Sequence, residues 1–431
     1  MRTCFFFLCG LIWTGYAKAR ISVPSTDTAR NATVKWKFQN KAKSYSTPAV
    51  LDDKVFFGSE DQKFYALDGN TGKVVWKFKT SGAINSSPAV ANQSVYFGSM
   101  DGFYYALNAD NGKLHWKFKT DGEQKIGRKG LWGMQPDIFY MDDPFDFFIS
   151  SPIVDREGVQ QTIYFGSSDG NLYALNADNG KLKWKFSTGG AVRSTPCLYN
   201  GIVYFGSWDQ FIYAVDQHSG KLIWKFKTNA DDENHLLEGI QASVVAENGR
   251  VYIGSRDGFF YALDAKNGNL LWQYSTWPSW ISSTSVVKNG VVFITTSDSH
   301  LMIALDAVSG KEKYKIKTKG YNFSSVSIVG DSLFLGDFTG NLYTVNGERA
   351  MVFFETEGRN KNKSILLNAD DKLDFQYAAG KMDLSLYSTT VEVLSLLHQL
   401  DPIVARPVIH NQSLYLNTAG GCFYAINLFN N

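Results

Sequence analysis

A motif of about forty residues recurs along the chain, and no other feature of the sequence constrains the fold as strongly. Its first copy contains four short runs in a fixed order, Ser46–Val50, Val55–Ser59, Phe64–Asp68 and Val75–Phe78. The alanine of the third run recurs at positions 66, 106, 174, 214, 262, 304 and 425, and Thr344 takes its place in one copy. Eight copies of this length are typical of the blades of a β-propeller.

Each copy predicts a four-stranded antiparallel sheet, with strands that we name A to D, because four β-prone runs alternate with turn residues. Glycine in the B–C and C–D links supplies the positive φ of tight hairpins, and aspartate binds nearby backbone amides. The aspartates that recur in the B–C link are therefore interpreted as turn formers and not as calcium ligands or catalytic carboxylates, at positions 61, 101, 169, 209, 257 and 298. The tryptophans of strand D are expected to pack between blades, at positions 76, 116, 184, 224 and 272.

The two ends of the repeat region complement one another. The eighth copy supplies strands A to C and then stops, whereas Val34–Phe38 has the sequence of a strand D with no A, B or C before it. Pairing the two completes the last blade and removes a free sheet edge. The sequence thus predicts an all-β fold, a single eight-bladed propeller of four-stranded antiparallel blades over residues 34–431, closed by the N-terminal strand.

Every large departure from the repeat falls in a D–A link. In antiparallel blades the D–A and B–C links share one face of the ring, so insertions at 121–148, 229–240, 275–281 and 355–402 crowd that face. Loops on a rigid scaffold commonly carry binding functions. The first insertion is aromatic and acidic, and it predicts either a lid or partner surface or a loop packed on the neighbouring blades.

Six residues near the mouth of the ring are candidates for ligand contacts. Most A strands, which line the central channel, begin with small hydroxyl residues such as Ser46 and Thr47. A cation or an amide in this crowded place needs partners or water, and aromatic residues in adjacent links add a stacking surface. The candidates, with scattered surface residues as the alternative interpretation, are Arg193, Trp208, Gln241, Arg256, Trp280 and Arg406.

The N-terminus has the pattern of a secretory signal peptide. Arg2 precedes an apolar run from Cys4 to Trp13, and Ala17-Lys18-Ala19 fits the small-x-small cleavage rule. The run is about half of the roughly 20 apolar residues that a membrane span needs. We therefore expect residues 1–19 to be removed, residues 20–33 to form a linker, and the mature protein to be soluble in the periplasm or secreted.

Charge and cysteine usage narrow the function classes. The formal net charge is only +2, from 43 basic and 41 acidic residues, which gives no electrostatic footprint for nucleic acid. Without the signal peptide only Cys197 and Cys422 remain, on opposite sides of the predicted ring, so no disulfide is expected. No metal-binding or Ser-His-Asp pattern is present in the sequence, and we expect a monomer.

The repeat contains two motifs in a fixed order, Gly-Ser-x-Asp-Gly and then Tyr-Ala-Leu-Asp-x-x-x-Gly-Lys-x-x-Trp. This repeat resembles the propeller repeat of pyrroloquinoline-quinone (PQQ) proteins, and the resemblance covers almost all of the mature chain. That family contains quinoprotein dehydrogenases and also cofactor-free propellers, such as the periplasmic subunit of the outer-membrane β-barrel assembly machine. The resemblance implies one alternative function, a soluble PQQ-dependent oxidoreductase for alcohols or sugars with PQQ and calcium as cofactors. Arg193, Arg256 and Arg406 would then bind the quinone's carboxylates, and Trp208 or Trp280 would stack on its plane.

The sequence departs from both branches of the family. Quinoprotein alcohol dehydrogenases carry a vicinal Cys-Cys pair and a Glu, Asn and Asp set around calcium, whereas this chain has no Cys-Cys pair and no set that can be matched residue by residue. The assembly-machine propeller usually lacks long insertions such as 121–148. We favour an exported, non-catalytic propeller that binds a protein partner or a small ligand through its insertion-bearing face, without a membrane span.

Overall fold

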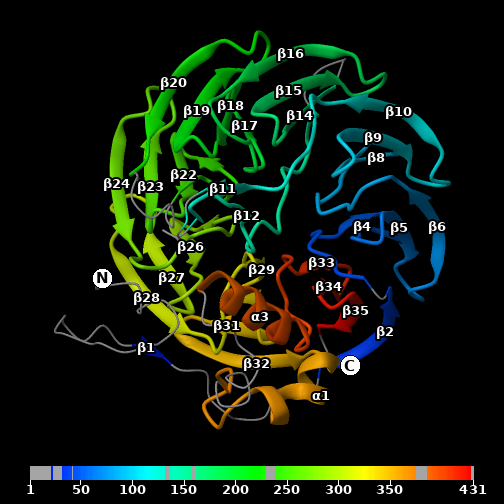
Figure 1. The fold of residues 1–431 in the computed structure, drawn as a ribbon, viewed down its shortest axis with the longest axis vertical. Helices are drawn as coiled ribbons and strands as arrows, with labels where there is room; N and C mark the ends of the chain where they lie inside the picture. The colour runs from blue at the N-terminus through cyan, green and yellow to red at the C-terminus, as the bar shows by residue number, and fades with distance from the viewer. Residues whose placement is uncertain are drawn as a thin grey trace.

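Eight four-stranded antiparallel sheets follow one another around a ring, as Figure 1 shows. The structure, a computed structural model, describes residues 21–22, 32–40, 42–131, 136, 138–156, 161–229, 238–374 and 386–428. The predicted signal peptide lies outside the described residues, as does most of the predicted linker. The predicted all-β, eight-bladed propeller is confirmed.

Each blade runs from the centre of the ring outward, with strand A innermost and strand D outermost (Figure 1). Blades 1 and 2 consist of β3 Ala49–Leu51, β4 Lys54–Gly58, β5 Lys63–Asp68, β6 Val74–Lys79, β7 Ala89–Ala91, β8 Ser94–Ser99, β9 Phe103–Asn108 and β10 Leu114–Lys119. Blades 3 and 4 consist of β13 Ile153–Asp155, β14 Thr162–Gly166, β15 Asn171–Asn176, β16 Leu182–Ser187, β17 Cys197–Tyr199, β18 Ile202–Gly206, β19 Phe211–Asp216 and β20 Leu222–Lys227.

Blades 5 to 8 continue the same order. Blades 5 and 6 consist of β21 Val245–Glu247, β22 Arg250–Gly254, β23 Phe259–Asp264, β24 Leu270–Ser275, β25 Val286–Lys288, β26 Val291–Thr295, β27 Leu301–Asp306 and β28 Glu312–Lys317. Blades 7 and 8 consist of β29 Ser327–Val329, β30 Ser332–Gly336, β31 Asn341–Asn346, β32 Arg349–Glu355, β33 Val408–His410, β34 Ser413–Asn417, β35 Cys422–Asn427 and β2 Thr33–Gln39.

The N-terminal strand closes the ring. β2 is the outermost strand of blade 8 and pairs antiparallel with β35, with Trp36 opposite Ala425 and Phe38 opposite Phe423. The predicted closure is therefore confirmed, with one more residue at each end of the strand than expected. A further short strand, β1 (Ile21–Ser22), pairs in parallel with β28 at the outer edge of blade 6, and the sequence analysis did not predict it.

The core consists of layers between adjacent blades. Strands B and C, such as β8 and β9, carry runs of buried residues because each sheet is covered by a neighbour on both faces. Strand D alternates between exposed and half-buried side chains, as in β10. Hydrophobic clusters accordingly join the strands of one blade to those of the next.

Tryptophans of strand D hold adjacent blades together. Trp76 of blade 1 donates from Nε1 to the carbonyl oxygen of Ala109 in blade 2 at 3.0 Å. Its indole lies against Gly112, which has a φ of +70° and where a Cβ would come within 2.6 Å of the ring. An indole-to-carbonyl bond to the next blade is also made by Trp36, Trp116, Trp184, Trp224 and Trp272. The predicted packing role is confirmed, and the closing strand takes part through Trp36.

The repeated aspartates organise the B–C turns. Asp101 accepts hydrogen bonds from the backbone N–H of Phe103 at 3.1 Å and from the hydroxyl of Tyr105 at 2.8 Å. Equivalent bonds are made by Asp61, Asp169, Asp209 and Asp257. Asp298 lacks the tyrosine bond because Ile303 stands where the other blades have tyrosine. The interpretation as turn formers is confirmed for these five blades.

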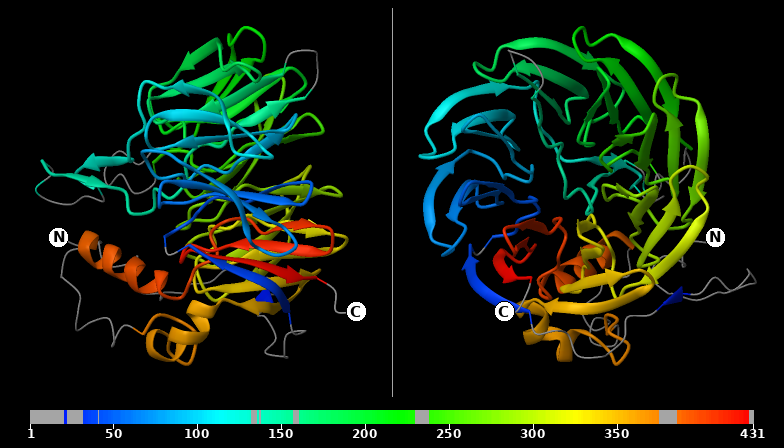
Figure 2. Two further views of the ribbon diagram at one scale, coloured as in Figure 1. Left: turned by 90° about the vertical axis from the view of Figure 1, so that its right-hand side faces the viewer. Right: turned by 180° about the vertical axis from the view of Figure 1, so that it is seen from behind.

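Both long insertions lie on the same face of the ring. The insertion after blade 2 contains a hairpin of β11 (Gly127–Lys129) and β12 (Tyr140–Asp142), and the insertion after blade 7 contains α1 (Glu357–Leu366) and α3 (Leu386–His398). The left view of Figure 2 shows the hairpin and α3 projecting side by side from the ring. The cysteines Cys197, in β17, and Cys422, in β35, form no disulfide bond, as predicted.

Candidate functional site

A buried arginine of blade 4 holds the 121–148 insertion on the mouth of the ring. Arg193 donates from Nη2 to Asp146 Oδ2 at 2.7 Å and to the carbonyl oxygen of Gln124 at 2.7 Å, and its Nη1 lies 3.5 Å from Glu123 Oε2. Burial raises the pKa of both carboxyl groups, while the guanidinium opposes that shift. Asp146 Oδ2 also accepts the backbone N–H of Ile126 at 2.9 Å. Both ends of the insertion therefore converge on one guanidinium.

A second buried arginine, from blade 5, anchors the middle of the same insertion. Arg256 forms a close ion pair with Asp143, and both side chains are almost fully buried. Its guanidinium lies over two indole rings, 3.8 Å from the ring centroid of Trp280 and 5.0 Å from that of Trp208. Aromatic faces stabilise a desolvated cation, so the two tryptophans favour the charged arginine in this position.

Gln241 and Trp280 contact the insertion, whereas Arg406 lies elsewhere. Gln241 donates from Nε2 to the carbonyl oxygen of Phe145 at 3.3 Å, and the ring of Phe145 meets Trp280 edge to face at a centroid distance of 5.3 Å. Arg406, in blade 8, donates its backbone N–H to Thr47 Oγ1 of blade 1 at 3.1 Å, and its side chain is exposed. The structure thus brings five of the six predicted residues together and leaves Arg406 apart.

The two interpretations of the first insertion apply to different parts of it. Residues 143–148 pack on the blades, through the contacts of Asp143, Phe145 and Asp146 described above. The β11–β12 hairpin projects away from the ring and carries the exposed side chains of Ile138, Phe139 and Tyr140 (Figure 2). Whether the six predicted residues also bind a ligand stays a prediction.

The second insertion packs against the first. Phe147 stacks on Tyr45 at a centroid distance of 5.0 Å and on Phe338 at 5.9 Å. These rings belong to a buried cluster that includes Val393, Leu394, Leu396 and Leu397 of α3. The hydroxyl of Tyr387, in the first turn of α3, donates to the carbonyl oxygen of Asp142 in β12 at 2.8 Å. Helix α3 therefore contacts the first insertion in two places, at Phe147 in the buried cluster and at Asp142 of the hairpin.

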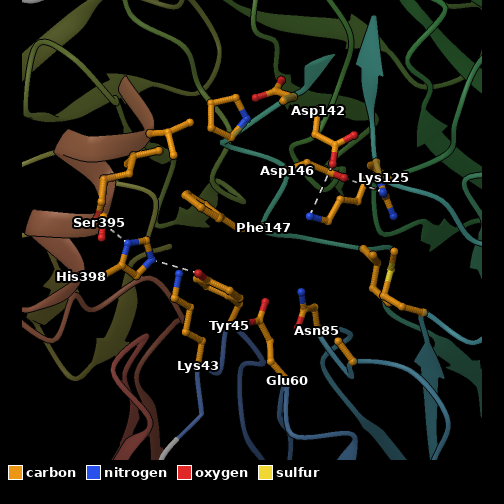
Figure 3. Close-up of a pocket in the computed structure, with 18 of the residues that line it drawn as sticks. Lys43, Tyr45, Glu60, Asn85, Lys125, Asp142, Asp146, Phe147, Ser395 and His398 are labelled. Atoms are coloured by element: carbon orange, nitrogen blue, oxygen red, sulfur yellow. Dashed lines mark hydrogen bonds and ion pairs between the residues drawn. The ribbon is translucent and has the colours of Figure 1, made fainter. Parts of the chain in front are cut away.

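A groove of about 700 Å³ opens between the hairpin, α3 and blades 1 and 2. Figure 3 shows it in close-up, with His398 and Ser395 on the helix side and Lys125 and Asp142 on the insertion side. Its apolar lining includes Tyr45, Met100, Phe147, Ile149, Val391 and Leu394. Its polar lining includes the charged side chains of Lys43, Glu60, Lys125, Asp142 and Asp146.

Two titratable groups on the helix side of the groove, Tyr45 and His398, contact one another. The hydroxyl of Tyr45 lies 3.0 Å from His398 Nε2, and His398 Nδ1 lies 2.6 Å from the carbonyl oxygen of Leu394. Burial lowers the pKa of His398 to about 4 and raises the pKa of Tyr45 well above its ordinary value. A general acid or base works best with a pKa near the working pH, and neither group has one.

Two buried side-chain oxygens at the groove have no partner. Asn85 Oδ1 and Asp146 Oδ1 make no hydrogen bond, although buried polar atoms are nearly always paired.

A smaller cavity of about 320 Å³ lies nearby, and the predicted residues Trp208 and Arg256 line it together with Arg128. Within the described ranges, no cluster of three or more His, Cys, Asp or Glu side chains suits a metal ion.

The sequence analysis missed one wall of the groove. It assigned no secondary structure to residues 355–402, whereas α3 supplies five lining residues that it had not singled out, Tyr387, Val391, Leu394, Ser395 and His398. The spacing of Val393, Leu396, Leu397 and Leu400 follows one helix face and was the available signal. It was overlooked because the β-repeat dominates the sequence on both sides.

The family is shown by comparison with known proteins. A family model described as "Outer membrane protein assembly factor BamB" matches residues 24–144, 149–276 and 209–352, which together span well over half of the chain. The chain belongs to this family. Among the described residues of this BamB-family chain, no helix is both long and apolar enough to cross a membrane.

Solved structures with the same fold come from both branches that the sequence resembles. BamB from Moraxella catarrhalis aligns with a TM-score of 0.64 and 15% identity, over 92% of this chain and 99% of that one. The quinohemoprotein alcohol dehydrogenase ADHIIG from Pseudomonas putida HK5 aligns with a TM-score of 0.62 and 14% identity, over 95% of this chain and 78% of that one. At these identities the likeness shows the fold alone.

Two further matches are more distant in kind. The computationally designed protein Ika8 aligns with a TM-score of 0.63 and 12% identity, over 90% of this chain and 97% of that one. A 36-residue stretch is 56% identical to part of the beta-alanine-activating enzyme of Danio rerio, and it covers 8% of this chain. The chain spans only 3% of the length of that enzyme, so the match concerns the repeat and not the enzyme's activity.

Proposed function

We propose that this chain is an exported propeller that binds a partner through its insertion-bearing face, with the groove between the hairpin and α3 as the binding site. The observation that carries the proposal is the groove itself, because it lies between two insertions that interrupt an otherwise regular repeat. Its volume falls in the range of ligand sites, and an apolar lining with charged groups suits an amphipathic ligand.

A protein segment is the occupant that the surroundings favour. Ile138, Phe139 and Tyr140 expose 66%, 59% and 58% of their surface on the hairpin beside the groove. Contiguous exposed apolar side chains on a soluble domain commonly mark interaction sites. The family description, an outer membrane protein assembly factor, is compatible with a role in binding other proteins.

The alternative, a PQQ-dependent oxidoreductase, finds less support in the contacts of the predicted residues. Binding the quinone's carboxylates requires available guanidinium groups, but Arg193 and Arg256 are buried and paired with Asp146 and Asp143. The guanidinium of Arg256 also covers one face of Trp280, and the Trp280 side chain is buried. These contacts of Arg193, Arg256 and Trp280 do not fit the quinone in this arrangement.

Site-specific photo-crosslinking tests the proposal. A photoreactive phenylalanine analogue at Val391, which is exposed and lines the groove, is expected to crosslink a periplasmic protein in cells. The matched control is the same analogue at Val308, an exposed valine in the C–D link on the opposite face. The same discrete product from both positions, or from neither, would contradict the proposal.

The export part of the proposal has its own measurement. Intact mass of the protein recovered from the periplasm is expected to correspond to a chain that begins at Arg20, because cleavage follows Ala19. A mass that includes Met1, or recovery in the cytoplasm alone, would contradict export.

A further inference from the structure

One residue in each blade forms a ring around the centre of the propeller. It is the second residue of the Ser-Ser-Pro type motif that precedes strand A, and A strands are the innermost strands of the blades (Figure 1). The residue before it is buried in every blade, whereas the ring residue itself is half-buried or exposed. The members of this ring are Thr47, Ser87, Ser151, Thr195, Ser243, Thr284, Ser325 and Arg406.

Hydrogen bonds between neighbouring blades order the ring. The backbone N–H of Thr47 donates to Ser87 Oγ at 2.9 Å, that of Ser87 to Ser151 Oγ at 2.9 Å, and that of Ser151 to Thr195 Oγ1 at 3.0 Å. Thr284 donates to Ser325 Oγ at 2.9 Å in the same way, and Arg406 donates to Thr47 Oγ1 at 3.1 Å. Each accepting hydroxyl keeps its own proton for a further acceptor.

Arg406 is the single charged member of the ring. Its side chain is accessible to solvent, and partial desolvation by the surrounding protein lowers the pKa of its guanidinium. In the part of the chain that the structure describes, no carboxylate or carbonyl oxygen pairs with the guanidinium. Arg193, Arg256 and Arg359, in contrast, are each paired with a carboxylate.

An arginine without a counter-charge beside hydroxyl donors is the arrangement that recruits an anion. Arginine stays protonated in proteins and presents paired N–H groups that match two oxygens of a carboxylate or phosphate. The hydroxyls of Thr47 and Ser325 belong to the blades on either side of Arg406, and they carry protons that no acceptor among the described residues uses. Arg406, Thr47 and Ser325 therefore lie in neighbouring blades at the start of the innermost strands, and each has a hydrogen-bond donor left for a ligand.

We propose that Arg406 and the hydroxyl ring bind a small oxyanion, a phosphate or carboxylate group, at the inner rim of the propeller. The guanidinium supplies the charge and a two-point hydrogen bond, and the hydroxyls of Thr47 and Ser325 donate to the remaining oxygens. This site is separate from the groove, whose lining residues do not include Arg406. The anion site and the proposed partner-binding function are therefore independent proposals, and an experiment that contradicts one leaves the other unaffected.

Titration of the whole mature chain with inorganic phosphate, and separately with acetate, tests the site at constant ionic strength in a chloride buffer. Calorimetry is expected to show saturable binding of at least one of the two anions. Arg406→Gln is expected to weaken that binding by about tenfold or more, and Arg406→Lys by less, because lysine keeps the charge and loses the two-point geometry. Arg349→Gln removes an exposed arginine at the start of β32 and is expected to leave binding unchanged.

The arms of the titration identify the ligand and can overturn the site. Binding of phosphate alone indicates a tetrahedral oxyanion, and binding of acetate alone indicates a carboxylate. Unchanged affinity in Arg406→Gln, or no saturation by either anion at concentrations on the order of 10 mM, contradicts the proposal. Nuclear magnetic resonance gives a second readout on the wild-type protein. The Nε–H resonance of Arg406 is assigned by its loss in Arg406→Lys, and it must shift in the wild type when the bound anion is added.

Discussion

Single buried charges decide how the first insertion sits on the ring. Arg193 and Arg256 lie in different blades, and each meets a carboxylate of residues 121–148 with little access to water. Removing one member of such a pair leaves the other charge buried without compensation, which costs far more than loss of an exposed ion pair. The anchoring of the insertion therefore depends on very few atoms.

Arg256→Ala is expected to lower the free energy of unfolding by about 3–5 kcal/mol, because Asp143 would remain buried without its cation. Lys185→Ala is the control: Lys185 pairs with Asp121, but both side chains are exposed, and we expect a loss of only about 0–1 kcal/mol. Urea unfolding measures both variants against the wild type. Equal losses in the two variants would contradict the anchoring role of Arg256.

His398 gives the stability a dependence on pH. Burial, with the nearby charge of Lys43 acting in the same direction, lowers its pKa from the ordinary 6.5 to about 4. Between these values the unfolded chain binds more protons than the folded chain, so the contribution of His398 is complete above about pH 6.5 and is lost as the pH falls toward 4.

His398→Gln is expected to flatten this dependence, since glutamine is polar and has no proton to bind in that range. The measurement is the free energy of unfolding of both proteins from neutral pH down to the acid limit of solubility. Other groups that titrate there, such as His300, are present in both proteins and cancel in the difference. Curves that stay parallel throughout would show that His398 does not contribute.

Among the secondary-structure elements, the seven-residue strand β2 is the one that closes the ring. It completes blade 8 by pairing with β35, and Trp36 carries the blade-to-blade contact into blade 1 through a 2.9 Å hydrogen bond to the carbonyl oxygen of Gly69. Without it, β35 would present a free edge, and unpaired edges promote aggregation. β1 makes only a two-residue parallel pairing at the rim of blade 6.

Deleting Val34–Phe38 is expected to cause unfolding or aggregation, because it opens the ring and removes Trp36 from its packing. Deleting Ile21 and Ser22 removes β1 alone and is expected to leave the thermal midpoint nearly unchanged. Thermal unfolding followed by light scattering compares the two deletions. A Val34–Phe38 deletion with the wild-type midpoint would mean that β2 does not stabilise the ring.

For the whole molecule, the repeat provides a rigid ring and the links between blades provide the differences. A designed propeller with 12% identity shares the fold, so the architecture tolerates almost complete exchange of side chains. Function in such a scaffold resides in its loops and its mouth, and not in the blades. Here the loops of one face form the groove, and the inner ring carries one unpaired arginine.

Addition of PQQ, with and without calcium, to the pure mature protein separates the binding protein from the oxidoreductase. We expect no tight binding, because Arg193 and Arg256 are already paired within the chain. Micromolar affinity corresponds to about 8 kcal/mol and is readily detected by tryptophan quenching. Tight binding that is lost in Arg193→Ala and is accompanied by dye reduction with alcohols or sugars would replace the proposed function.

The sequence by itself determined the ring. Positions such as Trp76 and Gly112 recur at blade spacing because each blade must present the same packing surface to its neighbour, so a local pattern repeated eight times specifies the architecture. The orphan strand Val34–Phe38 had one vacant position to fill, and the structure places it there. The helices of residues 355–402 were not predicted, because their apolar residues follow the helical period and not the alternation of the β-strands around them.

Only the tertiary structure decided what the exceptional residues do. Six residues could be singled out from the sequence because they broke the repeat, but their partners could not. Asp143 meets Arg256 across 113 positions, and Tyr387 meets Asp142 across 245. Such contacts depend on how an insertion folds over the ring, which no local pattern encodes. The same physics separates Arg406 from Arg193 and Arg256: an insertion covers the mouth at blades 4 and 5 with its own carboxylates, and none of the described carboxylates reaches the ring position in blade 8.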